Sequence, residues 1–228
     1  MKQRAVIIYG PPGAGKGTQA ELLVRRFQFI HFDTGRYLEQ LFRDPSAEAD
    51  PVLRKEKKLF DTGILCTPSW VLKIVSDATR RIAEAGFSVT YSGSPRTDFE
   101  AFGDDTNRGL LPLLEEMYGR DHIFIIMLEI TPETSIERNS HRVVCSVCGL
   151  PILAEAKLQR CAFCSGPTRK RTLDDPEIIK VRLKEFADRT YPIIEGMESR
   201  GYTVKRIDGL PAPYKVHESV MKVLGISQ

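Results

Sequence analysis

A glycine-rich segment, residues 10–18, follows directly on an apolar β-branched run (residues 5–9) and opens a stretch of helical periodicity. Its sequence is Gly-Pro-Pro-Gly-Ala-Gly-Lys-Gly-Thr. A strand, a glycine-rich turn, a lysine and a helix in this order bind nucleotide phosphates, because the glycines let successive N–H groups converge on anionic oxygens. Lys16 and the helix N-terminus add positive charge. The hydroxyl that often follows the lysine comes one residue later here, at Thr18, after Gly17. The segment therefore predicts a phosphate-binding loop.

The composition is that of an ordinary globular protein and excludes several classes. The 228 residues suffice for one α/β core with insertions, and 42% of them are hydrophobic. A net charge of +3, from 33 basic and 30 acidic residues, is too small to indicate a nucleic-acid partner. No apolar run approaches the roughly 20 residues that span a bilayer. The first run, residues 5–9, is too short for a signal-peptide core. We therefore expect a cytoplasmic protein with no membrane or nucleic-acid partner.

Apolar β-rich runs alternate with helical stretches, which predicts an α/β fold with a parallel sheet and helices on both of its faces. The expected strands are residues 5–9, 29–32, 89–91, 123–130 and 203–207. The run at 123–130 is almost continuously apolar, as a central strand buried on both faces is. Two segments exceed a minimal core: a mostly helical insert at residues 33–66, and residues 141–174, which show little periodicity. Inserts of this length are typical of lids and binding loops.

The second insert carries four of the five cysteines, in two Cys-x2-Cys pairs: Cys145 with Cys148, and Cys161 with Cys164. Both sulfurs of such a turn can face one ion, and two turns complete a tetrahedron with no open position. This pattern predicts a structural zinc site. Iron is an alternative, as are disulfides or free thiols. Cys66 stands apart, and we interpret it as a small packed residue rather than a nucleophile.

A cysteine ribbon can also bind nucleic acid. Nucleic-acid surfaces interleave aromatic and basic side chains, but Phe163 is the only aromatic residue between Cys145 and Cys164. The basic residues 169–171 fit phosphate contacts of either kind. The sequence therefore favours a structural ribbon over a nucleic-acid module.

Several arginines stand where a phosphate-transfer site needs them. They are Arg96 after a predicted strand, Arg138 and Arg142 where the cysteine insert begins, Arg171 where it ends, and Arg182 in the next helix. Arginine carries a fixed charge on a fork that matches phosphate oxygens. Arginines at both ends of a lid bring charge to the site when the lid closes. We therefore predict that these side chains converge on a transferring phosphoryl group.

With these motifs in order, the chain resembles the adenylate kinase family in its long form with a zinc-bearing lid. The resemblance is collinear over nearly the whole chain. It comprises the loop at 10–18, Thr34-Gly35, residues 63–66, Gly-Ser-Pro-Arg-Thr at 93–97, Arg138-x3-Arg142, Arg171-x2-Asp174 and Arg182-Leu183.

The resemblance implies an α/β fold with a P-loop NTPase core, a helical insert that binds a nucleoside monophosphate (NMP) and a four-cysteine zinc-ribbon lid. The core would comprise residues 1–32, 67–140 and 175–228, the NMP-binding insert residues 33–66 and the lid residues 141–174. The implied reaction is reversible transfer of the γ-phosphoryl of MgATP to an NMP, with AMP as the first candidate, by a monomer. Mg²⁺ would accompany ATP, and Zn²⁺ would be structural.

The resemblance also implies roles for individual residues. The catalytic set is Lys16, Arg96, Arg138, Arg171 and Arg182. The ATP-binding set is Gly13, Ala14, Gly15, Lys16, Gly17, Thr18, Arg138, Arg142 and Pro211. The NMP-binding set is Thr34, Arg36, Glu39, Ile64, Leu65, Cys66, Gly93, Ser94, Pro95, Arg96, Glu100, Arg171 and Arg182. No side-chain nucleophile is implied, because an oxygen of the acceptor phosphate attacks.

Four positions depart from the family pattern. Ser92 occupies the position where the family has an aspartate that organises magnesium through water, and Ser94 the position where it has a phenylalanine. Glu39 occupies the position where the family has an arginine that holds the acceptor phosphate. An anion there would repel the acceptor, unless Arg36, one helical turn earlier, takes over or pairs with Glu39. Glu100 occupies the position where the family has a glutamine that donates to and accepts from the adenine edge.

These departures leave alternatives open. An ionised Glu100 only accepts hydrogen bonds, which suits a two-donor edge such as that of guanine, whereas Thr34 is the adenine-type residue. The alternatives to an adenylate kinase are an NMP kinase of altered base preference (GMP, CMP or UMP) and a non-catalytic nucleotide-binding relative. The retained Lys16 and lid arginines favour an active enzyme.

Overall fold

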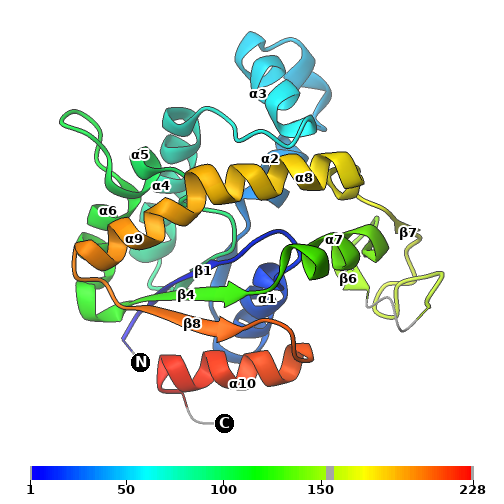
Figure 1. The fold of residues 1–228 in the computed structure, drawn as a ribbon. Helices are drawn as coiled ribbons and strands as arrows, with labels where there is room; N and C mark the ends of the chain where they lie inside the picture. Colours follow the sequence, from blue (N-terminus) through cyan, green and yellow to red (C-terminus); the bar gives the residue numbers. More distant parts are fainter. Residues whose placement is uncertain (1, 153–156, 227–228) are drawn as a thin grey trace.

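A five-stranded parallel sheet forms the centre of the molecule in the computed structural model, which describes residues 2–152 and 157–226 (Figure 1). Its strands are β1 (Ala5–Tyr9), β2 (Ile30–Phe32), β3 (Val89–Tyr91), β4 (Ile123–Glu129) and β8 (Val204–Asp208), in the order β2-β3-β1-β4-β8. Every pair in the sheet is parallel. The five strands expected from the sequence therefore form one sheet, and the α/β fold class is confirmed.

The middle strand is β1, and all five of its residues are buried. Strand β4, which the apolar run predicted to be a central strand buried on both faces, pairs with β1 on one edge and with β8 on the other. A strand paired on both edges and packed on both faces needs apolar residues on both faces, so the pattern did not distinguish the middle strand from its neighbour.

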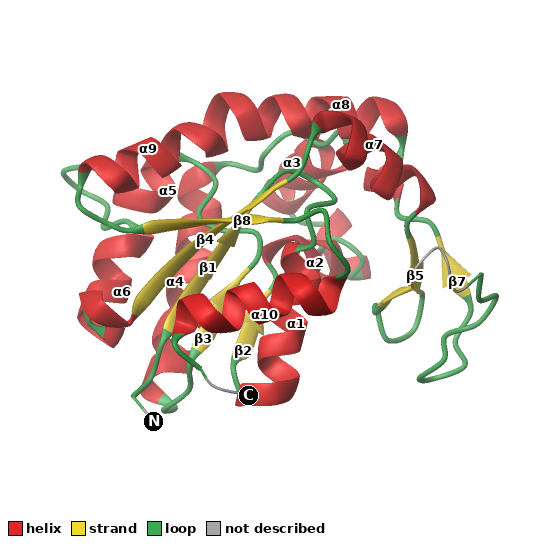
Figure 2. Ribbon diagram, turned by 60° about the horizontal axis from the view of Figure 1, so that its bottom comes forward, coloured by secondary structure: helices red, strands yellow, loops and turns green. Residues whose placement is uncertain are grey.

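Successive residues of β1 divide the core into two layers. Ile7 and Tyr9 face the layer formed by α4 (Pro68–Glu84), α5 (Asp98–Phe102), α6 (Leu110–Tyr118) and α9 (Tyr191–Ser199). Val6 and Ile8 face α1 (Lys16–Phe27) and α10 (Pro213–Leu224). Figure 2 shows these helices on opposite sides of the sheet. Because strand side chains alternate between faces, one apolar strand supports both layers and holds the loop at its carboxyl end between them.

Residues 34–61 form a helical unit that projects from the sheet (Figure 1). It contains α2 (Thr34–Leu41), the 3₁₀ turn η1 (Pro45–Glu48) and α3 (Pro51–Asp61). Asp33, Asp44 and Asp50 cap the three N-termini by accepting backbone N–H groups. Phe42 anchors the unit to the core, because its ring stacks on Trp70 of α4 at 6.1 Å between centroids.

The cysteine insert is a small antiparallel sheet that stands away from the main one (Figure 2). Its strands are β5 (Val143–Cys145), β6 (Pro151–Ile152) and β7 (Thr168–Arg169), in the order β6-β5-β7. Helix α7 (Pro132–His141) leads into this ribbon. The turn η4 (Thr172–Asp174) and helix α8 (Pro176–Glu185) lead out of it.

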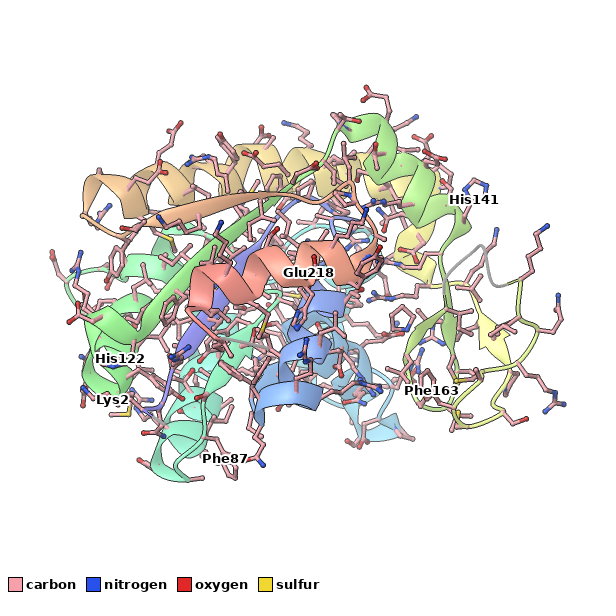
Figure 3. All side chains as sticks on the ribbon, turned by 90° about the horizontal axis from the view of Figure 1, so that it is seen from below. Lys2, Phe87, His122, His141, Phe163 and Glu218 are labelled. Atoms are coloured by element: carbon pink, nitrogen blue, oxygen red, sulfur yellow. The ribbon has the colours of Figure 1, made fainter. Side chains whose placement is uncertain are left out.

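The ribbon touches helix α1 through one aromatic side chain. Phe163 is 75% exposed, and the Arg25 guanidinium lies 5.4 Å from its ring centroid (Figure 3). A cation over an exposed ring contributes about 0.5–1 kcal/mol, so this contact holds the ribbon to α1 only weakly.

A π-helical turn, η5 (Phe186–Thr190), joins α8 to α9, and the short turn η2 (Arg120–His122) precedes β4. Such π-turns often lie at functional sites; here Thr190 Oγ1 donates to the carbonyl of Arg96 at 3.0 Å. In the part of the chain that the structure describes, every helix is too short or too polar to cross a membrane.

Candidate active site

The glycine-rich loop wraps the N-terminus of α1 at the carboxyl end of β1. Gly15 adopts the left-handed conformation there (φ +93°), and Gly13 has φ +80°. A Cβ at Gly13 would come within 2.7 Å of Asn139 Nδ2, so a side chain is excluded by neighbouring structure as well as by backbone strain. Ser135 Oγ donates to the carbonyl of Pro12 at 2.6 Å and ties the loop to α7.

Lys16 folds back over this loop. Its Nζ donates to the carbonyls of Gly10 at 2.7 Å and Pro11 at 2.9 Å. Burial lowers the pKa of Lys16 well below its usual value, and the charges of Arg96 and Arg182 lower it further. A polyphosphate would reverse both effects, because its negative charge favours the protonated amine.

The loop opens into a cavity of about 350 Å³ that six arginines line. They come from α2, from the segment after β3, from both ends of the ribbon and from α8: Arg36, Arg96, Arg138, Arg142, Arg171 and Arg182. Gly13, Gly15, Gly17 and Thr18 form the loop side of the same cavity, whereas Ala14 is buried behind it. The arginines predicted from separate parts of the sequence therefore surround one space.

Electrostatic repulsion within this arginine group is strong. Burial lowers the pKa of Arg182 to about 9, with Arg96, Arg142 and Arg171 as the repelling neighbours. Burial also lowers the pKa values of Arg96 and Arg171. Cations held together away from water need a compensating anion, so the cavity is suited to a polyphosphate.

Asp174 supplies part of the compensating charge. Its carboxylate is 2% exposed and accepts two bonds from Arg142, one of them from Nε at 2.9 Å; Arg182 Nη1 lies 3.7 Å away. Arg182 also donates to the carbonyl of Leu173 at 2.9 Å. Asp174 thus fixes two arginines in place without occupying the cavity wall.

Arg138 lies at the phosphate-loop end of the cavity. It donates to the carbonyls of Gly209 and Leu210 at 2.8 Å each, and lies 3.4 Å from that of Gly13. This places it between the phosphate loop and the segment after β8. Pro211 follows in that segment and is not among the residues that line the described cavities.

A second, smaller pocket of about 50 Å³ adjoins the cavity between α2 and α5. Seven predicted NMP-site residues line it: Thr34, Ile64, Leu65, Cys66, Gly93, Arg96 and Glu100. Ser94 lies beside it, and its hydroxyl is 2.8 Å from that of Thr34. Burial raises the pKa of the Cys66 thiol to about 12, which agrees with a packed residue and not a nucleophile.

Glu100 is 3% exposed at the floor of this pocket. The backbone N–H of Arg96 donates to Oε2 of Glu100 at 3.0 Å, and the hydroxyl of Thr97 donates to Oε1 at 3.1 Å. Burial raises the pKa of Glu100 to about 7. A carboxylate has four lone pairs, so the Glu100 oxygens can accept further hydrogen bonds from the edge of a ligand in the pocket.

Glu39 lies outside the cavity and faces the ribbon. It accepts from Arg43 at 2.7 Å and from Arg169 of β7 at 2.8 Å, and Arg171 is 4.0 Å away. Arg36 lines the main cavity and donates to the carbonyl of Cys148 at 3.1 Å. The pair between Glu39 and Arg36 that helix spacing suggested is replaced by contacts with the ribbon, because the ribbon brings two arginines closer.

The four ribbon cysteines form one cluster, with all Sγ atoms within 4.8 Å of one another. Cys145 Sγ lies 3.4 Å from Cys164 Sγ, and Cys148 Sγ 3.6 Å from Cys161 Sγ. A zinc tetrahedron with Zn–S bonds of about 2.3 Å has sulfurs about 3.8 Å apart, so the spacing fits this ion. Backbone N–H donation, first from Cys148, lowers the pKa of Cys145 to about 6. Burial and hydrogen bonds to the other thiols raise the pKa of Cys148 to about 11. It is therefore the spacing of the four sulfurs that fits a metal ion.

Comparison with known sequences decides the family. The adenylate kinase family model matches residues 8–202. The chain belongs to the adenylate kinase family. The adenylate kinase of Novosphingobium aromaticivorans is 33% identical over 210 residues, 90% of this chain and 91% of the relative. That of Desulforamulus reducens is 32% identical over 90% of this chain and 92% of its own. That of Caldicellulosiruptor bescii is 31% identical over 97% and 99%.

Family membership makes the protein an adenylate kinase-type phosphotransferase, which confirms the resemblance derived from the motifs. The structure shows which site residues the sequence interpretation missed. Asp174 belonged to a recognised motif, but its pairing with Arg142 joins residues 32 positions apart. His31 and Glu21, which line the adenylate kinase cavity, carried no sequence signal, because a lone histidine in a strand is common.

Proposed function

We propose that this chain transfers the γ-phosphoryl of MgATP to a nucleoside monophosphate, with AMP as the main acceptor, so that ATP and AMP give two ADP. The observation that carries the proposal is the arginine-lined cavity, which joins the phosphate loop at one end to the pocket of Thr34 and Glu100 at the other. Two nucleotides placed at these ends would bring their phosphates together among the arginines.

In the proposed reaction the phosphate loop holds the donor phosphates and Lys16 follows the transferring group. Arg138 and Arg142 act on the donor side, while Arg96 holds the acceptor phosphate. Arg171 and Arg182 stabilise the charge that develops on the equatorial oxygens. An acceptor phosphate oxygen attacks, so the protein contributes position, charge and exclusion of water.

Magnesium fits the oxygen donors around the cavity. The hydroxyls of Thr18 and Ser92 and the carboxylates of Glu21 and Asp33 line it. Mg²⁺ is bound chiefly by nucleotide phosphates and water, with few protein oxygens, and such a set suits it. When bound, the ion would neutralise charge on the donor phosphates.

We propose residues 33–66 as the acceptor-binding unit and residues 141–174 as the lid, with zinc held by the four cysteines. The arginines at both ends of the ribbon support this division, because ribbon movement would change their distance from the cavity. The contacts of Glu39 with Arg169 and of Arg36 with Cys148 are where the two units meet.

An acceptor panel tests the proposal. We expect purified protein with MgATP to phosphorylate AMP in a coupled assay, and more efficiently than CMP or UMP. Calorimetry with a bisubstrate dinucleotide provides the second arm. Tight binding without turnover of any monophosphate at millimolar concentration would contradict the kinase proposal and leave a nucleotide-binding relative.

A second candidate acceptor is GMP, and the buried Glu100 favours it. Adenine offers one acceptor and one donor on its Watson–Crick edge, whereas guanine offers two adjacent donors beside an acceptor. A protonated Glu100 matches adenine as a glutamine does, and an ionised one matches the two donors of guanine. The acceptor preference should therefore depend on the protonation of this carboxyl.

We predict that the ratio of kcat/KM for AMP to that for GMP falls about tenfold between pH 6 and pH 8, one hydrogen bond being worth about that much. The sign follows from the pKa of Glu100, raised to about 7 by burial: below it the carboxyl is protonated and donates, and above it the carboxylate only accepts. Glu100→Gln should favour AMP at every pH. A pH-independent ratio in the unaltered protein would exclude this role.

A further inference from the structure

Three polar side chains form a hydrogen-bonded chain that ends in the phosphate cavity. Glu21 of α1 contacts His31 of β2, with Oε1 2.9 Å from Nδ1. His31 Nε2 lies 2.7 Å from Oγ of Ser92, the residue after β3. All three line the cavity together with Lys16 and Thr18.

Burial and charge define the direction of each bond. The His31 side chain is 6% exposed and Ser92 is 7% exposed, while Glu21 keeps 30% of its side chain exposed. The bond from His31 lowers the pKa of Glu21, and Arg36 and Arg25 act in the same direction. Glu21 is therefore ionised and can only accept, so Nδ1 of His31 carries the hydrogen.

The remaining imidazole nitrogen then determines how Ser92 points. In the neutral ring Nε2 has no hydrogen and accepts the O–H of Ser92. With the ring in this neutral form the hydroxyl proton is used inside the protein, and the oxygen lone pairs remain for the cavity. The Glu21 charge polarises both bonds and makes that oxygen a stronger acceptor.

A free serine would not have this property, because a hydroxyl rotates to donate or accept as its partner requires. Ser92 is the position where the family pattern has an aspartate, an obligate acceptor. The chain of Glu21 and His31 converts a neutral hydroxyl into an acceptor backed by a carboxylate.

We propose that Glu21 and His31 are positioning residues for phosphoryl transfer, which hold Ser92 as a hydrogen-bond acceptor for water bound to the nucleotide's magnesium ion. This inference rests on the proposed function for its kinetic consequence. Its binding consequence does not, because the Mg²⁺ affinity of a nucleotide complex can be measured without turnover.

The test compares His31→Phe, Glu21→Gln and Ser92→Ala with the unaltered protein, using a non-hydrolysable ATP analogue. Calorimetric titration of Mg²⁺ into each analogue complex should show affinity about tenfold weaker for all three variants, the loss typical of groups that orient metal-bound ligands. In turnover, kcat should fall about tenfold at fixed Mg²⁺, with a smaller change in KM for the acceptor.

Two further variants separate positioning from structure. Ser92→Asp restores an obligate acceptor, so His31→Phe added to it should cost less than threefold. His122→Phe is the matched control, since His122 lies far from the ribbon end of the molecule (Figure 3). It should keep the Mg²⁺ affinity of the unaltered protein.

Proton NMR gives the structural readout. The Nδ1–H of His31 should appear as a downfield resonance that is lost in Glu21→Gln and His31→Phe but kept in Ser92→Ala. Unchanged Mg²⁺ affinity in folded His31→Phe or Ser92→Ala would overturn the proposal. If the resonance and the affinity losses appear while no monophosphate is phosphorylated, the proposed function fails and the positioning of Ser92 stands.

Discussion

Lys16→Met is expected to lower kcat by about three orders of magnitude, the largest effect of any single substitution in this chain. A charge held beside the transferring phosphoryl is stabilising chiefly in the transition state, where removal of one such group costs about 3–4 kcal/mol. Methionine keeps the length and apolar stem of the side chain but removes the charge. A coupled assay at saturating ATP and acceptor measures the change.

The same substitution should leave stability intact. Burial lowers the pKa of Lys16, which means that the unliganded protein disfavours its charge, and only two carbonyl contacts are lost. We expect a melting temperature within a few degrees of the unaltered protein. Lys2→Met is the control, because Lys2 is exposed and lies away from the ribbon (Figure 3). Retention of more than a tenth of kcat in Lys16→Met would contradict the role given to this amine.

Removal of the ribbon metal is expected to lower the melting temperature by about 10 °C, which is roughly 3 kcal/mol for a chain of this size. The ribbon strands are two or three residues long and bury few side chains, so a metal bound by the four cysteines would take the place of a hydrophobic core. Chelation should also lower kcat, because Arg142 and Arg171 flank the ribbon. Metal analysis and calorimetric melting with and without chelator measure the effect.

Cys148→Ser should reproduce the loss, whereas Cys66→Ala, outside the cluster, should retain the metal. The element found also decides between zinc and iron, since four sulfurs at these distances accept either. A protein purified without metal that melts at the same temperature with chelator present would remove the structural role from the ribbon.

The two inserts differ in how far the sequence anticipated them. The Cys-x2-Cys spacing brings each pair of sulfurs together within one turn. The four-sulfur cluster then needed only that the two turns lie against each other. The acceptor side was harder to predict. Glu39 was interpreted from Arg36, three residues before it, but its partners are Arg43, four residues after it, and Arg169, which comes from 130 positions away.

The amino-acid sequence by itself determined the local elements: the strands from apolar runs, the phosphate loop from the spacing of glycines and lysine, and the two cysteine turns from the Cys-x2-Cys spacing. Each depends on residues close in the chain, where backbone geometry fixes which side chains meet. The motif order was also enough to indicate the family. Only the tertiary structure decided which side chains distant in the sequence form hydrogen bonds and ion pairs with one another.

The pair of Arg142 with Asp174 and the chain of Glu21, His31 and Ser92 join residues whose partnership no local spacing indicates. His31 and Ser92 meet because β2 pairs with β3, and α1 packs against β2 to bring Glu21 there. Arg142 and Asp174 meet because the ribbon returns the chain from the end of α7 to the start of α8, and these two helices contact each other. Charge and hydrogen bonding act over a few ångströms of space whatever the separation along the chain. The chemistry of Ser92, neutral in the sequence, was therefore set by two residues that only folding brings to it.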